Sequence, residues 1–343
     1  MRFRHWVTLL GAAGALLLSL SPSRSGPLGP FDLQEILARS DLAAVVTPVG
    51  GQRCRVEAVY HGAQFAAGDV IELSYPKEPR GPGDHFNHDL RRAIADDKAP
   101  LCLFLKRAAP GGQVLTFAHA ETYSGFRVAP TRPKGPLTGK EAIEAEVMQG
   151  LQAKNPQVID DAVIWADYLK SERIFTELKR LAGKKDSPEP IQVWMLKEGI
   201  LQGKHAAVEG GIAFMKQHPA EGAPAQQGGP QGYTRVQGWH NTIARALTRI
   251  NTVDDSAAFN RIFRQADRNI AFLLVHSAVN WADKSSIHRL MEALSRDDRY
   301  AQYACLRALG KLTGRPIPTE SAFNQDRHTV IKAWQAWWEG QAK

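Results

Sequence analysis

Residues 285–314 read SSIHRLMEALSRDDRYAQYACLRALGKLTG, and this stretch decides the fold of the larger part of the chain. Its apolar residues recur at steps of three and four, which is the spacing of one face of an α-helix. The acidic pair Asp297-Asp298 interrupts the pattern, and Gly314 follows the second apolar run. Acidic residues favour helix starts and glycine favours helix ends. The stretch therefore predicts a short helix, a tight acidic turn and a longer helix.

The same periodicity continues through most of residues 140–343, where the longer helices are expected to begin near residues 156, 188, 233, 268 and 297. The longest gap between these starts contains residues 220–232, AEGAPAQQGGPQG, which have no periodicity and predict a flexible insertion. Residues 269–282, NIAFLLVHSAVNWA, are apolar on more than one face and predict a helix packed between neighbours. Helix pairs at such a period predict an α-solenoid, in which stacked repeats share one core.

The acidic turn and the helix after it resemble the HEAT-like repeats of bacterial exported proteins. In that pattern an acidic turn precedes a Val-Arg pair, an alanine lies three residues later, and an Ala-Leu pair follows after three more. Cysteine takes the alanine position in this chain, and the matching residues are Asp297, Asp298, Cys305, Ala308 and Leu309. The Val-Arg pair is replaced by Ala301-Gln302. The resemblance implies a HEAT-like helical repeat domain over residues 140–343.

The C-terminal segment, residues 326–340, reads DRHTVIKAWQAWWEG and carries an aromatic stripe. At helical spacing, one face collects four large apolar residues, which are Val330, Trp334, Trp337 and Trp338. A solenoid needs a closing helix that covers its last core layer. We therefore expect the stripe to be a structural cap, and a ligand platform is the alternative.

Residues 31–130 follow a different period and predict a small β domain. Short runs rich in Val, Ile and Phe alternate with Gly- and Pro-rich turns, which is typical of strands. Five strands are expected, over residues 43–49, 54–60, 69–75, 100–106 and 113–119. This pattern predicts a small antiparallel barrel or sandwich. A possible helix between the third and fourth strands makes the element order similar to that of an OB-fold. Residues 131–139 then form a linker to the helical domain.

Two groups of residues in the β domain are candidate sites. Cys54 and Cys102 lie in predicted strands and are the candidate disulfide pair, unless they are simply small buried residues. His85 and His88 lie three apart in the insertion, and His61 follows the second strand. A metal site needs three or four converging ligands. The three histidines are therefore a candidate metal site, with a solvated loop as the alternative.

The first 25 residues predict a secretory signal peptide. Two arginines precede an apolar run of 14 residues, and the small residues Ser23 and Ser25 follow it. The run is shorter than the roughly 20 residues that cross a bilayer. We therefore expect an exported protein, periplasmic or secreted, without stable membrane insertion after cleavage. An uncleaved N-terminal anchor is the alternative.

Composition and motifs argue against several function classes. The formal net charge is +8, but Lys and Arg are scattered among acidic residues, so we expect no nucleic-acid binding. The chain has no nucleophile elbow, phosphate-binding loop or HExxH helix, so we expect neither an enzyme nor a cofactor. The sequence predicts an exported, non-enzymatic scaffold or adaptor that binds a protein or peptide partner. The alternatives are a metal-binding or metal-dependent hydrolytic protein that uses His85 and His88, and an accessory subunit that serves only assembly.

Overall fold

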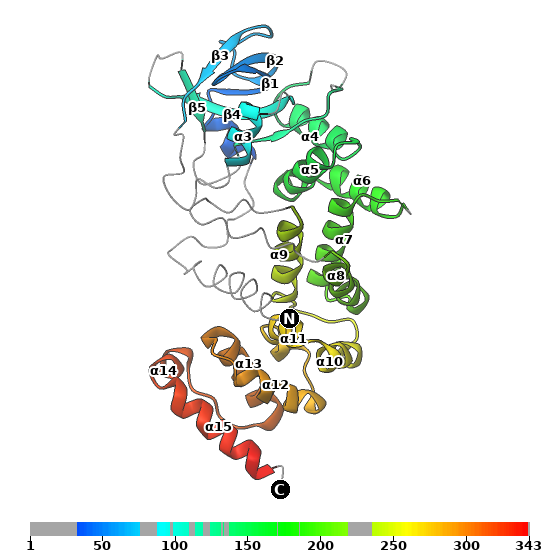
Figure 1. Ribbon diagram of the computed structural model, residues 1–343, viewed down its shortest axis with the longest axis vertical. Coiled ribbons are helices and arrows are strands. Elements are labelled where there is room, and N and C mark those ends of the chain that lie inside the picture. The colour runs from blue at the N-terminus through cyan, green and yellow to red at the C-terminus, as the bar shows by residue number, and fades with distance from the viewer. Residues whose placement is uncertain are drawn as a thin grey trace, which may run out of the picture. The chain divides into compact units, whose positions relative to one another are not determined.

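The computed structural model describes residues 33–75, 88–96, 99–109, 114–118, 124–131, 133, 137–169, 171–184, 186–218 and 235–341. The predicted signal peptide (1–25) and the predicted flexible insertion (220–232) lie outside these ranges. The chain divides into two compact units, one that ends at Gln192 and one that begins at Val193. The first unit contains the described strands, and the second is helical (Figure 1).

The first unit contains a small barrel and five described helices. Its strands are β1 (Leu42–Gly50), β2 (Arg53–His61), β3 (Val70–Leu73), β4 (Leu101–Arg107), β5 (Val114–Phe117) and β6 (Gly125–Arg127). Its helices are α2 (Leu33–Ala38), α3 (His88–Asp96), α4 (Gly139–Gly150), α5 (Pro156–Leu169) and α6 (Glu172–Ala182). The five predicted strands correspond to β1 to β5, and the possible helix between the third and fourth strands is α3.

Strands β1 to β5 close into a barrel in the order β1-β2-β3-β5-β4, and β4 pairs with β1 to complete the ring. Strand β6 adds to the edge of β4. Strands β3 and β5 run parallel, with Glu72 opposite Val114 and Leu73 opposite Leu115. The barrel is therefore mixed, and the prediction of a wholly antiparallel arrangement is wrong for this pair. The reason is topological, because a closed ring of five strands cannot reverse direction at every step.

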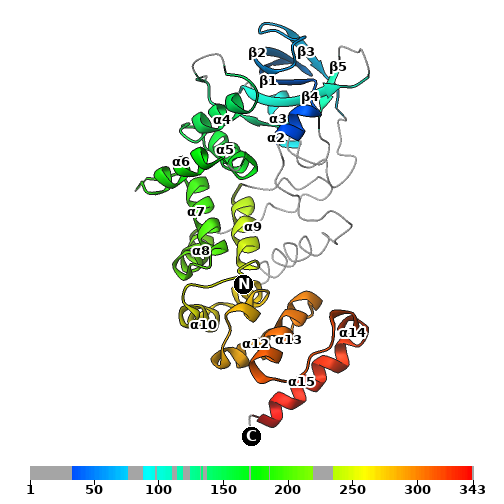
Figure 2. The same cartoon turned by 180° about the vertical axis from the view of Figure 1, so that it is seen from behind.

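The barrel interior is apolar. Successive side chains of a strand face opposite sides, so alternate residues of β1 and β4 point inwards. The interior residues of the strands are Leu42, Ala44, Val46, Cys54, Val56, Ile71, Leu73, Leu101, Leu103, Leu105, Leu115 and Phe117. Helix α3 contributes three residues to this core, which are Leu90, Ala93 and Ile94. Figure 2 shows α2 and α3 at the same end of the barrel.

Helix α5 covers the outer face of β4 and β6. The ring of Phe104 on β4 stacks on the indole of Trp165, with centroids 5.1 Å apart and planes 15° apart. Phe126 of β6 lies 4.9 Å from the same indole. All three side chains are buried. Strand β4 is therefore enclosed on both faces, which explains why all of its first five residues are apolar.

Polar contacts also join α4 and α5 to the barrel. The Tyr60 hydroxyl at the end of β2 donates to the buried carboxylate of Glu146 on α4. The backbone N–H of Arg127 on β6 donates to Asp161 Oδ2 of α5 at 2.8 Å, and the Arg127 guanidinium lies 3.3 Å from the same oxygen. The compact unit that contains the barrel therefore continues through these helices.

Every regular element described in the second unit is a helix or a 3₁₀ turn. It contains the C-terminal part of α7 (Glu189–Leu201), then α8 (His205–Gln217), α9 (Arg235–Leu247), α10 (Ser256–Gln265), α11 (Arg268–Val275), α12 (Ile287–Leu294), α13 (Arg299–Thr313), α14 (Glu320–Gln325) and α15 (Arg327–Gln341). Two 3₁₀ turns, η2 (Ala278–Asn280) and η3 (Lys284–Ser286), separate α11 from α12. Helices α5, α7, α9, α11 and α13 begin within two residues of the expected starts. Among the described residues, no helix has the length and hydropathy that crossing a membrane requires.

A buried asparagine fixes the connection between α11 and α12. Asn260 of α10 is 1% exposed, and its Nδ2 donates to Ser256 O at 2.7 Å and to Trp281 O at 3.0 Å. Its Oδ1 accepts the Asp283 N–H at 3.1 Å and the Ser286 hydroxyl. Both ends of the amide are thus satisfied, as a buried polar side chain requires. The side chain therefore holds the loop after η2 against α10.

The predicted helix over residues 269–282 is interrupted. Helix α11 ends at Val275. Two side chains that follow it donate hydrogen bonds to backbone carbonyls at and just after the end of α9. Ser277 Oγ donates to Leu247 O at 3.4 Å, and Asn280 Nδ2 donates to Ile250 O at 2.8 Å. Leu247 is the last residue of α9, where a helix leaves its carbonyls without partners, and Ile250 lies in the connection that follows. These bonds hold residues 277–280 in a 3₁₀ turn, so the helix that the periodicity predicts over residues 269–282 ends at Val275.

Candidate functional site

The segment between α13 and α14 forms one wall of a groove. Helix α13 ends at Gly314, whose φ of 71° lies in the left-handed region that favours glycine. Pro316 and Pro318 follow, and a proline has no N–H with which to extend a helix. The next helix begins after Thr319, whose hydroxyl accepts the Ala322 N–H at 3.3 Å. The segment 315–318 is therefore held non-helical by its own sequence.

Helix α15 forms the other wall and carries the predicted tryptophan stripe. Trp334 is 2% exposed and belongs to the core of the helical unit, against which the half-buried Val330, Trp337 and Trp338 pack. The rings of Trp334 and Trp337 meet edge to face at 5.4 Å. The Trp338 ring lies 6.3 Å from the imidazole of His288 on α12. The structure thus places the four predicted cap residues together, on one helix and against one core.

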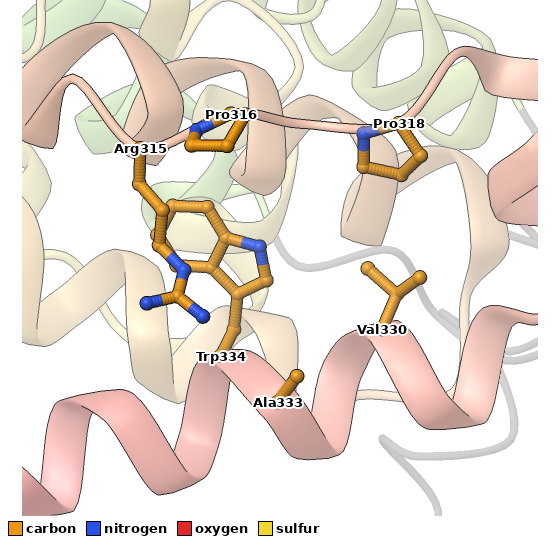
Figure 3. Close-up of a pocket in the computed structure, with 6 residues that line it drawn as sticks. All are labelled: Arg315, Pro316, Pro318, Val330, Ala333 and Trp334. Carbon is orange, nitrogen blue, oxygen red and sulfur yellow. The ribbon is translucent and has the colours of Figure 1, made fainter.

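The groove between these walls has a volume of about 430 Å³. Six residues line it, which are Arg315, Pro316, Pro318, Val330, Ala333 and Trp334. Ligand pockets range over about 300–1,000 Å³, so this groove has room for a small ligand or for a short part of a peptide. Figure 3 shows the indole of Trp334 between the two walls, with its nitrogen on the ring edge that faces Pro318 and Val330.

Arg315 is the charged group of the groove. Its guanidinium carbon lies 5.3 Å from the ring centroid of Trp334 and 5.6 Å from that of Trp337. Stacking of this kind contributes about 0.5–2 kcal/mol and holds the planar cation in place. Within the described part of the chain, the guanidinium forms no hydrogen bond and no ion pair. Its N–H groups are therefore available to a ligand in the groove.

Sequence reasoning identified Trp334 and Val330 but missed Arg315, Pro316 and Pro318. The available signal was the presence of Pro316 and Pro318 two and four residues after Gly314, which predicts an extended segment. Nothing in the periodicity indicates that this segment returns to α15.

The residues of the predicted repeat motif lie at a helix start and in the core. Asp298 caps α13 by accepting the Ala301 N–H at 2.8 Å, and Asp297 Oδ1 lies 2.7 Å from the guanidinium of Arg327 on α15. The three remaining motif residues, Cys305, Ala308 and Leu309, are buried in the core. Gln302, which replaces the arginine of the pattern, donates to Arg296 O at 2.6 Å and to Leu294 O at 3.2 Å.

The structure describes Cys54 and Cys102 as separate buried residues, which is the alternative to the candidate disulfide. Cys54 lies inside the barrel. Cys102 alternates along β4 with the interior residues Leu101 and Leu103, so it faces the outer side of the wall together with Phe104. No bond joins these two cysteines, both of which the structure describes. Burial raises the pKa of the Cys54 thiol to about 12 and also raises that of the buried Cys305 thiol, which makes both poor nucleophiles.

The predicted metal site lies mostly outside the described residues. His85 belongs to the segment 76–87, and the side chain of His88 at the start of α3 is also outside the description. His61 is described and is exposed at the end of β2. The described residues contain no group of three or more possible metal ligands from His, Cys, Asp and Glu. The metal site stays a prediction.

The half-buried His276 follows α11. Its imidazole meets the ring of Phe272 edge to face at 5.7 Å. Burial lowers its pKa, and the negative charge of Asp298 opposes that shift. His276 is therefore a neutral packing residue near pH 7.

Comparison of the chain with family models, with curated proteins and with solved structures finds no match. The fold that the chain shows is a small mixed β-barrel over about residues 40–127, followed by many helices. Any function must therefore be argued from the residues of the chain itself.

Proposed function

We propose that the chain is an exported, non-enzymatic scaffold protein of the bacterial envelope that binds a segment of a partner protein. The observation that carries the proposal is the groove beside α15. Trp334, Val330 and the two prolines give the groove an apolar lining. Arg315 supplies hydrogen-bond donors at the edge of this lining. Apolar surface with a few placed polar groups is typical of a binding site. In the groove itself no lining residue is an acid, a histidine or a cysteine.

The spacing of contacts in the helical unit supports a HEAT-like stack. Polar contacts join residues 28 to 32 positions apart at four places. They join the end of α9 to η2, η2 to α13, the start of α11 to the end of α12, and the acidic turn to α15. Several other polar contacts of the unit join residues 21 to 26 or 40 to 49 positions apart, so the separation near 30 supports a repeat at these four places only. In this proposal α15 closes the stack, and the groove lies at its last layer.

The order of strands supports an OB-like barrel. The ring β1-β2-β3-β5-β4 with α3 between β3 and β4 has the element order expected from the sequence. We carry no binding residues over from that likeness, and we propose for the barrel a supporting role beside α4 and α5.

Site-specific photocrosslinking in the cell envelope tests the function. A benzoylphenylalanine is placed at Ala333, which lines the groove, and at Ala336, an exposed alanine of the same helix that does not line it. We expect a discrete adduct from position 333 and none from position 336. The same adducts from both positions, or none from either, would show that the groove binds no partner.

A further inference from the structure

Two donors of the groove have no partner within the described chain. The Arg315 guanidinium stacks on Trp334 without forming a hydrogen bond or an ion pair. The Trp334 Nε1–H likewise bonds to no described residue. Figure 3 shows that nitrogen on the side of the indole towards Pro318 and Val330. Neither donor is among the described buried atoms that lack a partner, so both reach the surface, where an acceptor of a ligand can approach them.

We propose that the groove recognises an acidic, apolar peptide segment in an extended conformation. This inference rests on the proposed function and names the chemistry of the partner. A carboxylate of the segment pairs with Arg315, and a main-chain carbonyl accepts the Trp334 indole N–H. An apolar side chain next to the carboxylate lies between Pro318 and Val330.

Charge is the argument for this occupant. A guanidinium presents planar, parallel N–H groups that match a carboxylate, and its position over the indole face of Trp334 leaves the edge that carries these groups open to a ligand. No acidic side chain lines the groove to neutralise Arg315. A basic segment would meet the unpaired cation of Arg315 here, whereas an acidic one neutralises it.

The size of the groove sets the length of the segment. A volume of about 430 Å³ is at the lower end of the range of about 300–1,000 Å³ for ligand pockets. One apolar side chain with its neighbouring main-chain carbonyl and carboxylate is a match for this space. The determinant is therefore short, and residues further along the partner contribute through the surface around the groove.

Peptide titration of the full chain tests the inference. The probe is the fluorescein-labelled peptide Gly-Asp-Leu-Glu-Leu-Gly with blocked ends, and its neutral match is Gly-Asn-Leu-Gln-Leu-Gly. Affinity is measured by fluorescence anisotropy, and the site by the indole N–H signals of ¹⁵N-tryptophan-labelled protein. The Trp334 signal is assigned from Trp334→Phe or, if that variant does not fold, by removing the other seven tryptophans one at a time.

We expect the acidic peptide to bind, to shift the Trp334 indole signal, and to bind about tenfold more tightly than its neutral match, as one charged hydrogen-bonded contact provides. Arg315→Gln should remove that preference. Arg307→Gln, the same change at an exposed position of α13, should leave it intact. Equal binding of the two peptides, binding that leaves the Trp334 signal in place, or no binding would overturn the inference.

The crosslinking from position 333 separates this inference from the function on which it rests. An adduct at position 333 together with no peptide binding means that a partner uses the groove but not through acidic chemistry. Peptide binding at Trp334 without any adduct supports the acidic chemistry of the groove and contradicts the scaffold function.

Discussion

Replacing Trp165 by alanine should destabilise the barrel together with α4 and α5. The indole is 2% exposed, contacts Phe104 and Phe126, and donates its Nε1–H to Gly125 O at 3.3 Å. Truncation of a buried tryptophan costs about 3–5 kcal/mol of unfolding free energy. A domain has only about 5–15 kcal/mol in total. The loss therefore removes a large part of the stability of the first unit.

Hydrogen exchange in urea, read by mass spectrometry, measures this loss element by element. Urea lowers unfolding free energy by about 1–3 kcal/mol per molar. A loss of about 4 kcal/mol should therefore lower the urea concentration at the unfolding midpoint by about 2 M, and by the same amount for β1, β4 and α5. A common shift is the expected result because the indole belongs to α5 and packs directly on β4 and β6 of the barrel wall.

The matched control is Trp281→Ala in the second unit. Trp281 is 3% exposed and packs on Phe259 and Phe263. The Trp281→Ala variant should lower the protection of amide hydrogens from exchange in α10 to α13 and leave the protection of β4 unchanged. The reasoning is refuted if Trp165→Ala exposes α5 but leaves β1 and β4 protected, because the barrel would then be stable without its helices.

Three further predictions concern single residues. Gly314→Ala should lower the unfolding free energy by about 1–2 kcal/mol, because the backbone φ is 71° and no neighbour lies near the added Cβ. Gly203→Ala should lower the melting temperature much more than Gly314→Ala, because its Cβ would lie 1.8 Å from Thr252 O. Equal shifts in melting temperature would contradict this. Burial lowers the pKa of His276 below its usual value, so as the pH falls the imidazole takes up a proton in the unfolded chain before it does so in the folded chain. The unfolding free energy should therefore be unaffected by this group above about pH 6.5 and should decrease below that pH. That fall should be smaller in His276→Gln, and an identical pH profile would refute the assignment. The Cys305 thiol should resist iodoacetamide at pH 8 in the native protein and react in urea, because burial raises its pKa; native labelling detected by mass spectrometry would contradict this.

The strands were predictable because turn residues flank each apolar run of the sequence, and β1 to β5 lie at those runs. The parallel pair of β3 and β5 depends on ring closure, which no local pattern contains. Strand β6 is only three residues long and is formed by pairing with the edge of β4. Alternation also predicts that residues of one strand face opposite sides, but only the register between strands places Cys54 inside and Cys102 outside.

The helices were predictable from period, but their neighbours were not. Periodicity shows that Trp165 lies on an apolar face of α5, and the sequence does not say that Phe104 of the barrel covers it. The end of α11 at Val275 depends on bonds from Ser277 to a carbonyl 30 residues earlier. In the groove, Trp334 was visible as part of a stripe, whereas the stacking of Arg315 on it is a tertiary contact.

The most direct test of the proposed function is to identify the partner residue that becomes joined to a benzoylphenylalanine at position 333. Mass spectrometry of the digested adduct gives that residue and its sequence context. The groove chemistry predicts an apolar residue of an extended segment with Asp or Glu immediately beside it, and loss of the adduct in Arg315→Gln. A joined segment that is basic or lacks a neighbouring carboxylate, or an adduct unchanged by Arg315→Gln, would contradict the acidic recognition proposed for the groove, and the absence of any adduct would contradict the scaffold function.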